Sequence, residues 1–286
     1  MAYLAARAAN PKAVVALPGL TYWWDVDRQQ SQYLERLLSA LASDSTAVSN
    51  SFYFDAAVLH LYNEPEGLLR APILFKALMA QRGLDKPIWI NETNVAPWND
   101  PINPMPRGDF RATLEEQASF VIQAYAWGLL SGAERISVYP MADGDLPRGW
   151  EQMGLIRKDG SERPAYRALQ TVTRYLNGAQ PVGIERAVDH VRLRFERPGS
   201  VITCLWATGP QPVLTTVPAT FSTATLVDRS GGKRQLWAQD GLFWIALSGA
   251  TANTVPRDSA RFLIGGEPFL LVEGAAPPRA VLGSSR

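Results

Sequence analysis

The stretch that decides the fold is Lys86-Pro87-Ile88-Trp89-Ile90-Asn91-Glu92-Thr93-Asn94. Its apolar first half is typical of a buried strand, and the polar run that begins at Asn91 marks the end of that strand. The preceding Arg82-Gly83 is typical of a helix C-terminus, because a cationic last turn is followed by glycine, and Pro87 prevents the helix from continuing. A helix followed by a buried strand predicts an α/β unit that carries Glu92 where the strand ends.

The rest of the first 178 residues repeats this alternation. Buried strands are predicted at residues 13–17, 54–61, 87–91 and 135–139, and helices near residues 2–8, 32–42, 68–81, 112–130 and 164–176. Such alternation indicates βαβ units around a parallel sheet. Four strands fall short of the eight strands and roughly 250 residues of a complete (β/α)8 barrel. Half of such a barrel is therefore the main prediction, and an open doubly wound sheet is the alternative.

The pattern changes after Asn177-Gly178. Residues 191, 193 and 195 are apolar and alternate with charged residues, as on a half-buried antiparallel strand. Asp240-Gly241 and Gly265-Gly266 predict hairpin turns, and the single cysteine, Cys204, is expected in a buried strand. We predict an all-β domain, a sandwich or jelly roll, over residues 179–275, and a disordered tail at residues 276–286.

Composition narrows the class of partner. The 28 basic and 27 acidic residues give a net charge of +1, which provides no electrostatic basis for binding nucleic acid or an anionic membrane. The nine tryptophans can supply rings for a neutral ligand. No apolar run reaches the roughly 18 residues of a membrane-spanning helix, and the first residues lack the layout of a secretion signal. The sequence thus favours a neutral partner and leaves the compartment open.

Polar and aromatic side chains follow each predicted strand, in chain order Trp23, Trp24, His60, Tyr62, Glu64, Glu92, Asn94, Trp98 and Tyr139. Because the C-terminal ends of barrel strands meet on one rim, these side chains are expected to converge. Structural roles are the alternatives. Thr93 or Asn94 would cap a helix, with Glu92 as a solvated carboxylate beside it. His60 would be a hydrogen-bonded structural residue, and the tryptophans would be buried anchors.

Three segments resemble the clan A glycoside hydrolases, with families 39 and 5 as the nearest in pattern. The segments are residues 54–62, residues 86–94, and Gly154-Leu155-Ile156-Arg157-Lys158-Asp159-Gly160 leading to Arg163-Pro164-Ala165-Tyr166. In that clan the sixth strand ends in a His and aromatic pair, the seventh ends in the nucleophilic glutamate, and a loop after the eighth leads to the last helix. The resemblance covers about residues 1–178 and implies a partial TIM barrel of about strands 5 to 8, and the β domain resembles an accessory sandwich.

The resemblance implies a retaining glycosidase that acts on the O-glycosyl bonds of an oligosaccharide or polysaccharide and needs no metal or organic cofactor. Glu92 is the implied nucleophile, a role that requires an ionised carboxylate beneath the anomeric carbon. Its neighbours on the rim are expected to bind the sugar or the nucleophile, and they are His60, Tyr62, Asn94 and Tyr139. Trp23, Trp24 and Trp98 could offer flat faces to pyranose rings.

Clan A enzymes also carry an acid/base glutamate in an Asn-Glu-Pro type motif at the end of the fourth strand, and the matching strand is absent here. Asn63-Glu64-Pro65 spells this motif one βα unit before Glu92. Glu64 is therefore a candidate acid, although adjacent strand ends approach the separation of about 5–5.5 Å of retaining carboxylates only with favourable side chains. An exposed loop carboxylate near a helix start is the alternative.

Half a barrel would present unpaired strand edges and an uncovered inner face. We therefore expect a partner chain or self-association to complete it. Secretion is expected for the complete parent protein, whereas the compartment of this chain stays open. Two other hypotheses compete with a glycosidase: a catalytically silent carbohydrate-binding or interaction protein, and a fragment without independent function.

Overall fold

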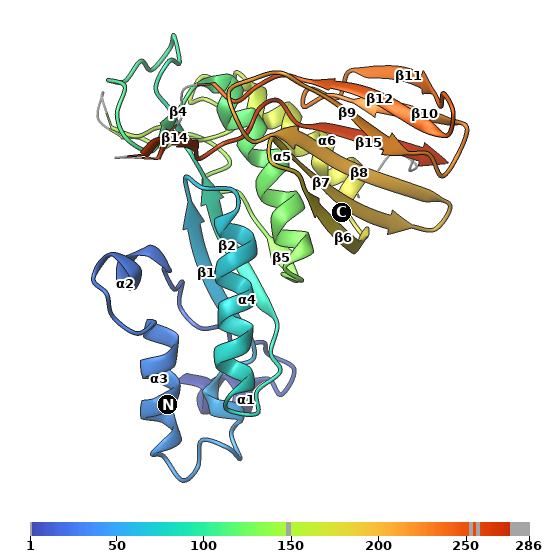
Figure 1. Cartoon of the computed structure of the whole chain (residues 1–286). Helices are drawn as coiled ribbons and strands as arrows, with labels where there is room; N and C mark the ends of the chain where they lie inside the picture. Colours follow the sequence, from blue (N-terminus) through green and yellow to red (C-terminus); the bar gives the residue numbers. More distant parts are fainter. Residues whose placement is uncertain (1, 147–149, 252–253, 256–257, 275–286) are drawn as a thin grey trace, which may run out of the picture.

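The computed structural model describes residues 2–146, 150–251, 254–255 and 258–274, and the predicted tail at residues 276–286 lies outside this part. The chain has a mixed α/β region followed by a region of antiparallel sheets (Figure 1). Among the described residues, no helix combines the length and the apolar character that a membrane crossing needs.

A parallel sheet forms the centre of the α/β region. Its strands are β1 (Ala57–Tyr62), β2 (Ile88–Asn94) and β5 (Arg135–Ile136), hydrogen-bonded in the order β1-β2-β5. The strand predicted at residues 135–139 is therefore too long. The backbone beyond β5 still follows β2, because the Ser137 and Tyr139 amides donate to the carbonyls of Ile90 and Thr93.

The strand predicted at residues 13–17 is present only as an irregular neighbour of β1. Two isolated parallel bridges, Ala16 with Ala56 and Leu20 with Leu59, join this segment to β1. Between them one more residue lies on the first segment than on β1, so the pairing contains a bulge. Proline has no amide hydrogen to donate, and Pro18 in the bulge explains why a regular ladder is not formed.

Helices cover the parallel sheet and connect its strands. They are α1 (Ala2–Ala9), α2 (Trp23–Asp27), α3 (Tyr33–Ala42), α4 (Gly67–Ala80), α5 (Leu114–Leu130) and α6 (Pro164–Leu176), with a 3-10 turn η1 at Ser51–Tyr53. The predicted helix at residues 164–176 is confirmed, and the other predicted helix ends lie within two residues of the observed ones. Thr113 and Glu116 form a capping box that starts α5, which satisfies amides that the helix itself cannot pair.

The region after α6 contains two layers of sheet. The larger layer has the strand order β11-β10-β15-β8-β7-β6. Its strands are β6 (Gln180–Arg186), β7 (His190–Arg197), β8 (Ser200–Ala207), β10 (Thr223–Val227), β11 (Lys233–Trp237) and β15 (Phe269–Gly274). The second layer pairs β9 (Val213–Pro218) with β12 (Leu242–Leu247). Two short strand pairs complete the described sheets: β13 (Thr254–Val255) with β14 (Asp258–Phe262), and, before α5, β3 (Ala96–Pro97) with β4 (Arg111–Ala112). The alternation predicted for residues 191–195 is confirmed, because Val191, Leu193 and Phe195 are buried.

The two predicted hairpin turns have different outcomes. Asp240-Gly241 is a two-residue turn, with both residues at positive φ and reciprocal hydrogen bonds between Gln239 and Leu242. Gly265-Gly266 is not a hairpin turn, because β14 and β15 do not pair with each other. Glycine is required there by close approach, since a Cβ on Gly265 would lie 2.3 Å from the Trp206 ring.

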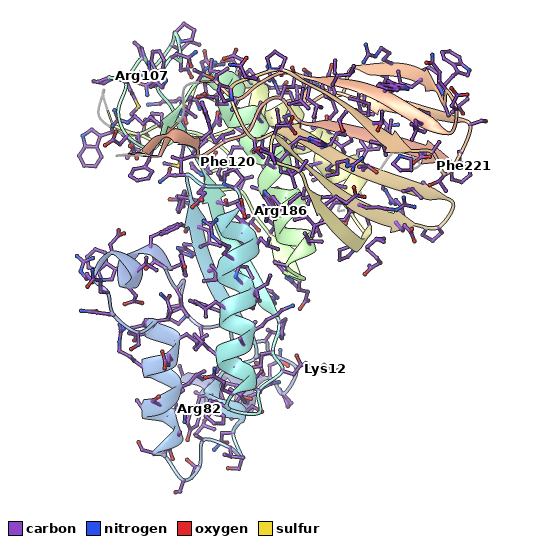
Figure 2. All side chains as sticks on the ribbon, in the orientation of Figure 1. Lys12, Arg82, Arg107, Phe120, Arg186 and Phe221 are labelled. Carbon is purple, nitrogen blue, oxygen red and sulfur yellow. The ribbon has the colours of Figure 1, made fainter. Side chains whose placement is uncertain are left out.

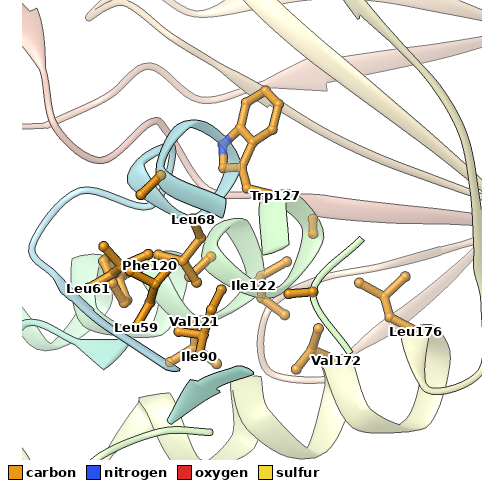
Figure 3. Close-up of a cluster of buried hydrophobic side chains, with 14 of the residues drawn as sticks. Leu59, Leu61, Leu68, Ile90, Phe120, Val121, Ile122, Trp127, Val172 and Leu176 are labelled. Carbon is orange, nitrogen blue, oxygen red and sulfur yellow. The ribbon is translucent and has the colours of Figure 1, made fainter. Parts of the chain in front are cut away.

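One continuous core joins the helices to the parallel sheet and to the larger layer of the β domain. Figure 3 shows Leu59, Ile90, Phe120 and Val172 among side chains contributed by β1, β2, α5 and α6. The same core extends into the β domain through Trp127 of α5, whose ring meets that of Trp206 edge-on at 5.6 Å. Helix α5 therefore lies between the parallel sheet and the β domain (Figure 1).

A second core fills the space between the two layers of the β domain, around Phe243, Ile245 and Leu271. Cys204 belongs to the first core and is fully buried, as predicted. Burial raises the pKa of its thiol, so it stays protonated and acts as a small apolar side chain.

Candidate active site

An irregularity between β1 and β2 determines where Glu92 points. Leu59 pairs with Ile90, but the next residue, His60, pairs with Glu92, so Asn91 is an extra residue on β2. Side chains alternate between the faces of a strand, and a slip of one residue exchanges the faces. The bulge therefore puts Glu92 on the same face as His60, and without it Glu92 would share the helix-covered face with Leu61.

The Glu92 carboxylate has two neighbours on β1. The Tyr62 hydroxyl donates a hydrogen bond to Glu92 Oε2 at 2.6 Å, and His60 Nδ1 lies 3.1 Å from the same oxygen. The side chains of Glu92 and His60 are 28% and 29% exposed. The structure thus brings together three of the residues singled out in the sequence, and the carboxylate is both held and accessible.

A glycine in the segment beside β1 makes room for the imidazole. A Cβ on Gly19 would lie 2.1 Å from His60 Nε2, closer than any side chain allows. The backbone at this point is fixed, because the Leu20 amide donates to Val58 and the His60 amide donates to Leu20. Gly19 is therefore needed for the observed position of His60 against Glu92.

The Tyr62 hydroxyl is kept in its protonated form. Burial is the largest cause that raises the pKa of Tyr62, followed by its hydrogen bond to Glu92 and by the negative charge of Glu92. A protonated phenol donates a hydrogen bond to a carboxylate over the neutral pH range. Tyr62 can therefore fix the orientation of Glu92 Oε2.

Asn94 is completely buried, and its side chain is engaged within the protein. Its amide nitrogen donates to the carbonyls of Tyr139 and Met153, and its oxygen accepts from Gln117 Nε2 at 3.2 Å. In this conformation Asn94 holds the segment after β5 against the end of β2. It does not face the solvent beside Glu92, and a helix-capping role is not observed.

Tyr139 and Glu64 lie in different settings on the same rim. Tyr139 is 52% exposed and lies in the segment that follows β5. Glu64 is buried, and its Oε1 lies 2.6 Å from a guanidinium nitrogen of Arg70 on α4. The Glu64 carboxylate is thus committed to an arginine, and the exposed loop position considered for it is not observed.

The three tryptophans considered as sugar platforms have other described partners. Trp23 is half-buried and meets the Tyr22 ring edge-on at 4.9 Å, whereas Trp24 is exposed and lies 3.3 Å beneath the Arg28 guanidinium. Trp98 lies under Arg107 at 5.9 Å. None of these described contacts is with Glu92, His60 or Tyr62.

A buried cluster of charged residues, which was not predicted from the sequence, links the loops that follow β2 and β5. Arg163, almost fully buried, contacts Asp100 at 2.6 Å and Asp143 at 2.7 Å, and Arg157 contacts Asp100 at 2.9 Å. Asp143 also accepts from the Gly154 amide at 2.8 Å. The cluster ties the loop after β2 to the long loop after β5. Arg157 and Arg163 belong to the third segment of the family resemblance, but no ion pair was predicted for them.

The electrostatics of this cluster favour its charged state. Burial raises the pKa of Asp100, but the hydrogen bonds from Arg157, the Ile102 amide and Arg163 outweigh it, so the net pKa lies below the ordinary value. Burial alone would lower the pKa of Arg163, and its hydrogen bonds to Asp143 and Asp100 reverse that effect. Among the described residues, no group of three or more His, Cys, Asp or Glu side chains could hold a metal ion.

Comparison of the sequence with known proteins identifies no relative. No protein-family model matches the chain, and no curated protein sequence is similar to it. Any relationship must therefore be sought in the fold.

Comparison of the structure finds glycoside hydrolases of clan A. A family 39 glycoside hydrolase from Bacteroides cellulosilyticus WH2 matches with a TM-score of 0.60 and 16% identity, over 82% of this chain and 47% of that one. A glucosidase from Croceicoccus marinus gives 0.59 and 11%, over 96% and 63%. A family 30 endoxylanase from Clostridium papyrosolvens C71 gives 0.56 and 13%, over 94% and 58%. The fold resembles these hydrolases, and the chain spans about half to three fifths of their length.

Proposed function

We propose that this chain carries the nucleophile half of a retaining glycoside hydrolase, with Glu92 as the nucleophile. One observation carries the proposal. A partly exposed carboxylate ends a strand of a parallel sheet and is held by a tyrosine and a histidine from the neighbouring strand. The resemblance of the fold to glycoside hydrolases supports a catalytic role for this carboxylate, because the reactive groups of such barrels lie at strand ends.

The proposed reaction is a double displacement. Glu92 attacks the anomeric carbon, the glycosidic C–O bond breaks, and an acid/base carboxylic acid gives its proton to the leaving oxygen. The ester formed on Glu92 is then hydrolysed by a water molecule that the same acid/base residue deprotonates. Tyr62 and His60 both contact Oε2, so we assign them to orienting the carboxylate and Oε1 to the attack.

The described residues include no second carboxylate that is clearly placed to act as the acid/base. Glu64 spells the expected motif, but its carboxylate lies against Arg70. We therefore propose that the acid/base carboxylate is contributed by the remaining strands of a barrel, of which the segment at residues 16–20, β1, β2 and β5 form strands 5 to 8.

Two features of the α/β region support a missing set of strands. The four parallel segments lie side by side in chain order, as consecutive barrel strands do, and the outer edges of the first and last are not paired within the described sheet. Beside β5 an open groove of about 750 Å³ lies between α5 and α6, with apolar walls that include Leu129, Ile136 and Leu176. A further strand paired with the free edge of β5 would lie beside this groove.

The direct test uses the full gene product that contains these residues. Glu92→Gln should abolish hydrolysis across a panel of aryl glycosides, because the amide cannot form the glycosyl ester. The matched control is Glu115→Gln, an exposed residue in the first turn of α5, which should leave turnover unchanged. Full activity of Glu92→Gln would end the assignment.

A second candidate function is glycan binding without catalysis. It is favoured by the engagement of Glu64 with Arg70 and by the exposed outer face of the second β layer, where Trp244 is 52% exposed near exposed Leu214. Flat aromatic faces of this kind can bind sugars. Glycan binding by the full chain that is lost in Trp244→Ala, with no hydrolysis by the full gene product, would favour this function over the first.

A further inference from the structure

We propose that the β domain is a working part of the candidate site, because Arg186 at the end of β6 positions the loop that follows β1. This inference rests on the proposed function, since that loop forms the rim beside Glu92. Figure 2 labels Arg186 at the junction between the α/β region and the β domain.

A chain of charged contacts runs from Arg186 into this loop. Arg186 contacts Glu66 Oε1 at 2.8 Å, and Arg70 approaches the same oxygen at 3.7 Å. The other terminal nitrogen of Arg70 lies 2.6 Å from Glu64 Oε1. Both glutamates precede α4, where the positive end of the helix dipole also favours negative charge. Arg70 therefore links the two carboxylates, and Arg186 holds the outer one.

The loop transmits this constraint to the candidate site. Glu64 lies two residues after Tyr62, whose hydroxyl holds Glu92, and the intervening Asn63 donates its amide to the Asn94 carbonyl at 3.0 Å. Asn63 has a φ of 69°, in the left-handed region that asparagine adopts more readily than most other non-glycine residues, so it forms a tight turn directly after Tyr62. The position of Tyr62 thus depends on a loop that is stabilised from both ends.

A cavity explains why a charged contact matters at this junction. A space of about 330 Å³ separates Pro65 and Glu66 from the β domain, where Arg186, His190 and Trp206 line the opposite wall. Apolar packing is interrupted there, so the ion pair across the rim of the cavity orients the loop. Arg186 is itself fixed, because its guanidinium lies 4.8 Å over the ring of buried Trp127.

Arg186, Glu66 and Arg70 are positioning residues in this proposal. None of them touches the Glu92 carboxylate in the described contacts, and they act on it through the loop and Tyr62. The β domain would then be required for a well-ordered rim. Its removal would disturb the loop after β1 without changing Glu92, His60 or Tyr62.

Hydrogen exchange on the 286-residue chain tests the coupling without any substrate. In Arg186→Gln, the backbone amides of residues 64 and 66–70 should exchange about two- to fivefold faster, the effect expected from losing a partly exposed ion pair. The matched control is Arg194→Gln, because Arg194 pairs with Glu196 within β7 and its side chain is 38% exposed, against 48% for Arg186. Unchanged exchange in Arg186→Gln, or equal acceleration in both variants, would overturn the proposal.

Kinetics on the full gene product test the consequence at the site. Arg186→Gln should lower kcat severalfold and leave KM within about twofold, because the loop positions Tyr62 and Tyr62 orients the Glu92 carboxylate. Arg186→Lys should restore kcat by keeping the charge. An unchanged kcat despite faster exchange would refute the role at the site. If Glu92→Gln were fully active, the proposed function would fail, but the exchange experiment would still decide whether the β domain controls the loop.

Discussion

The hydrogen bond between Tyr62 and Glu92 offers the sharpest perturbation of the candidate site. Tyr62→Phe removes one hydroxyl and leaves the ring in place, so the carboxylate loses a donor that lies 2.6 Å from Oε2. A hydrogen bond to a charged group contributes about 1.5–3 kcal/mol, and about 1.4 kcal/mol corresponds to a tenfold change in rate. If the bond orients the nucleophile in the transition state, kcat/KM for an aryl glycoside should fall about 10- to 100-fold.

A second tyrosine provides the control for this variant. The Tyr53 hydroxyl donates to Asp44 Oδ2 at 2.7 Å, a bond of the same chemistry in the segment before β1. Tyr53→Phe should leave kcat/KM unchanged, whereas Tyr62→Phe should reduce it with little change in KM. Wild-type kcat/KM in Tyr62→Phe, or an equal loss in both variants, would refute the idea that this hydrogen bond serves catalysis.

The raised pKa of Tyr62 adds a pH dependence with a definite sign. Its pKa in the folded state lies above the value of about 10 in the unfolded chain, so its contribution to stability is complete below about pH 10 and is lost as the pH rises further. Urea unfolding at about pH 8 and about pH 11 should therefore show a smaller alkaline loss of stability in Tyr62→Phe than in the wild type. An identical loss in both proteins would contradict the assigned environment of Tyr62.

The remaining predictions concern the cluster above the site and the glycine beside it. Arg163→Ala should lower the free energy of unfolding by about 3–5 kcal/mol, because Asp143 loses its arginine and Asp100 keeps only Arg157. Arg167→Ala breaks an exposed pair with Glu162 and should cost about 0–1 kcal/mol, and equal urea midpoints for the two variants would contradict this. The pKa of Asp100 is lowered, so its stabilising contribution should be present above about pH 4 and be lost as the pH falls. Asp100→Asn should therefore flatten the acid side of a plot of unfolding free energy against pH. Gly19→Ala should displace His60 and lower kcat/KM at least about 10-fold, and full activity in that variant would show that the observed position of His60 is dispensable.

The order of elements in the α/β region could be predicted from local patterns. The apolar run at residues 88–90 and the polar residues after it place Glu92 at a strand end, and the helix at residues 164–176 has the predicted bounds. These features depend on periodicity and on neighbouring residues in the sequence. The bulge at Asn91, which turns Glu92 to the face of His60, depends on pairing with β1 and left no signal in the sequence.

Long-range contacts account for what the sequence could not predict. Asn94 has the composition of a site residue, but the long loop after β5 covers it and uses its amide. Arg163 and Asp100 are far apart in the chain, so their pairing could not be inferred from spacing. Gly265-Gly266 looks like a turn, but it is needed where the backbone passes the Trp206 ring. In each case the decisive neighbour is distant in sequence, and local propensity carries no information about it.

The assignment of Glu92 as the nucleophile is tested most directly by chemical rescue. In the full gene product, Glu92→Ala should lose hydrolysis of an aryl glycoside, because no carboxylate remains to form the glycosyl ester. Added azide should restore release of the aryl group by entering the space left by the side chain, and the product should be a glycosyl azide whose anomeric configuration is opposite to that of the substrate. Hydrolysis by Glu92→Ala at the wild-type rate, or an azide product that keeps the configuration of the substrate, would contradict the assignment.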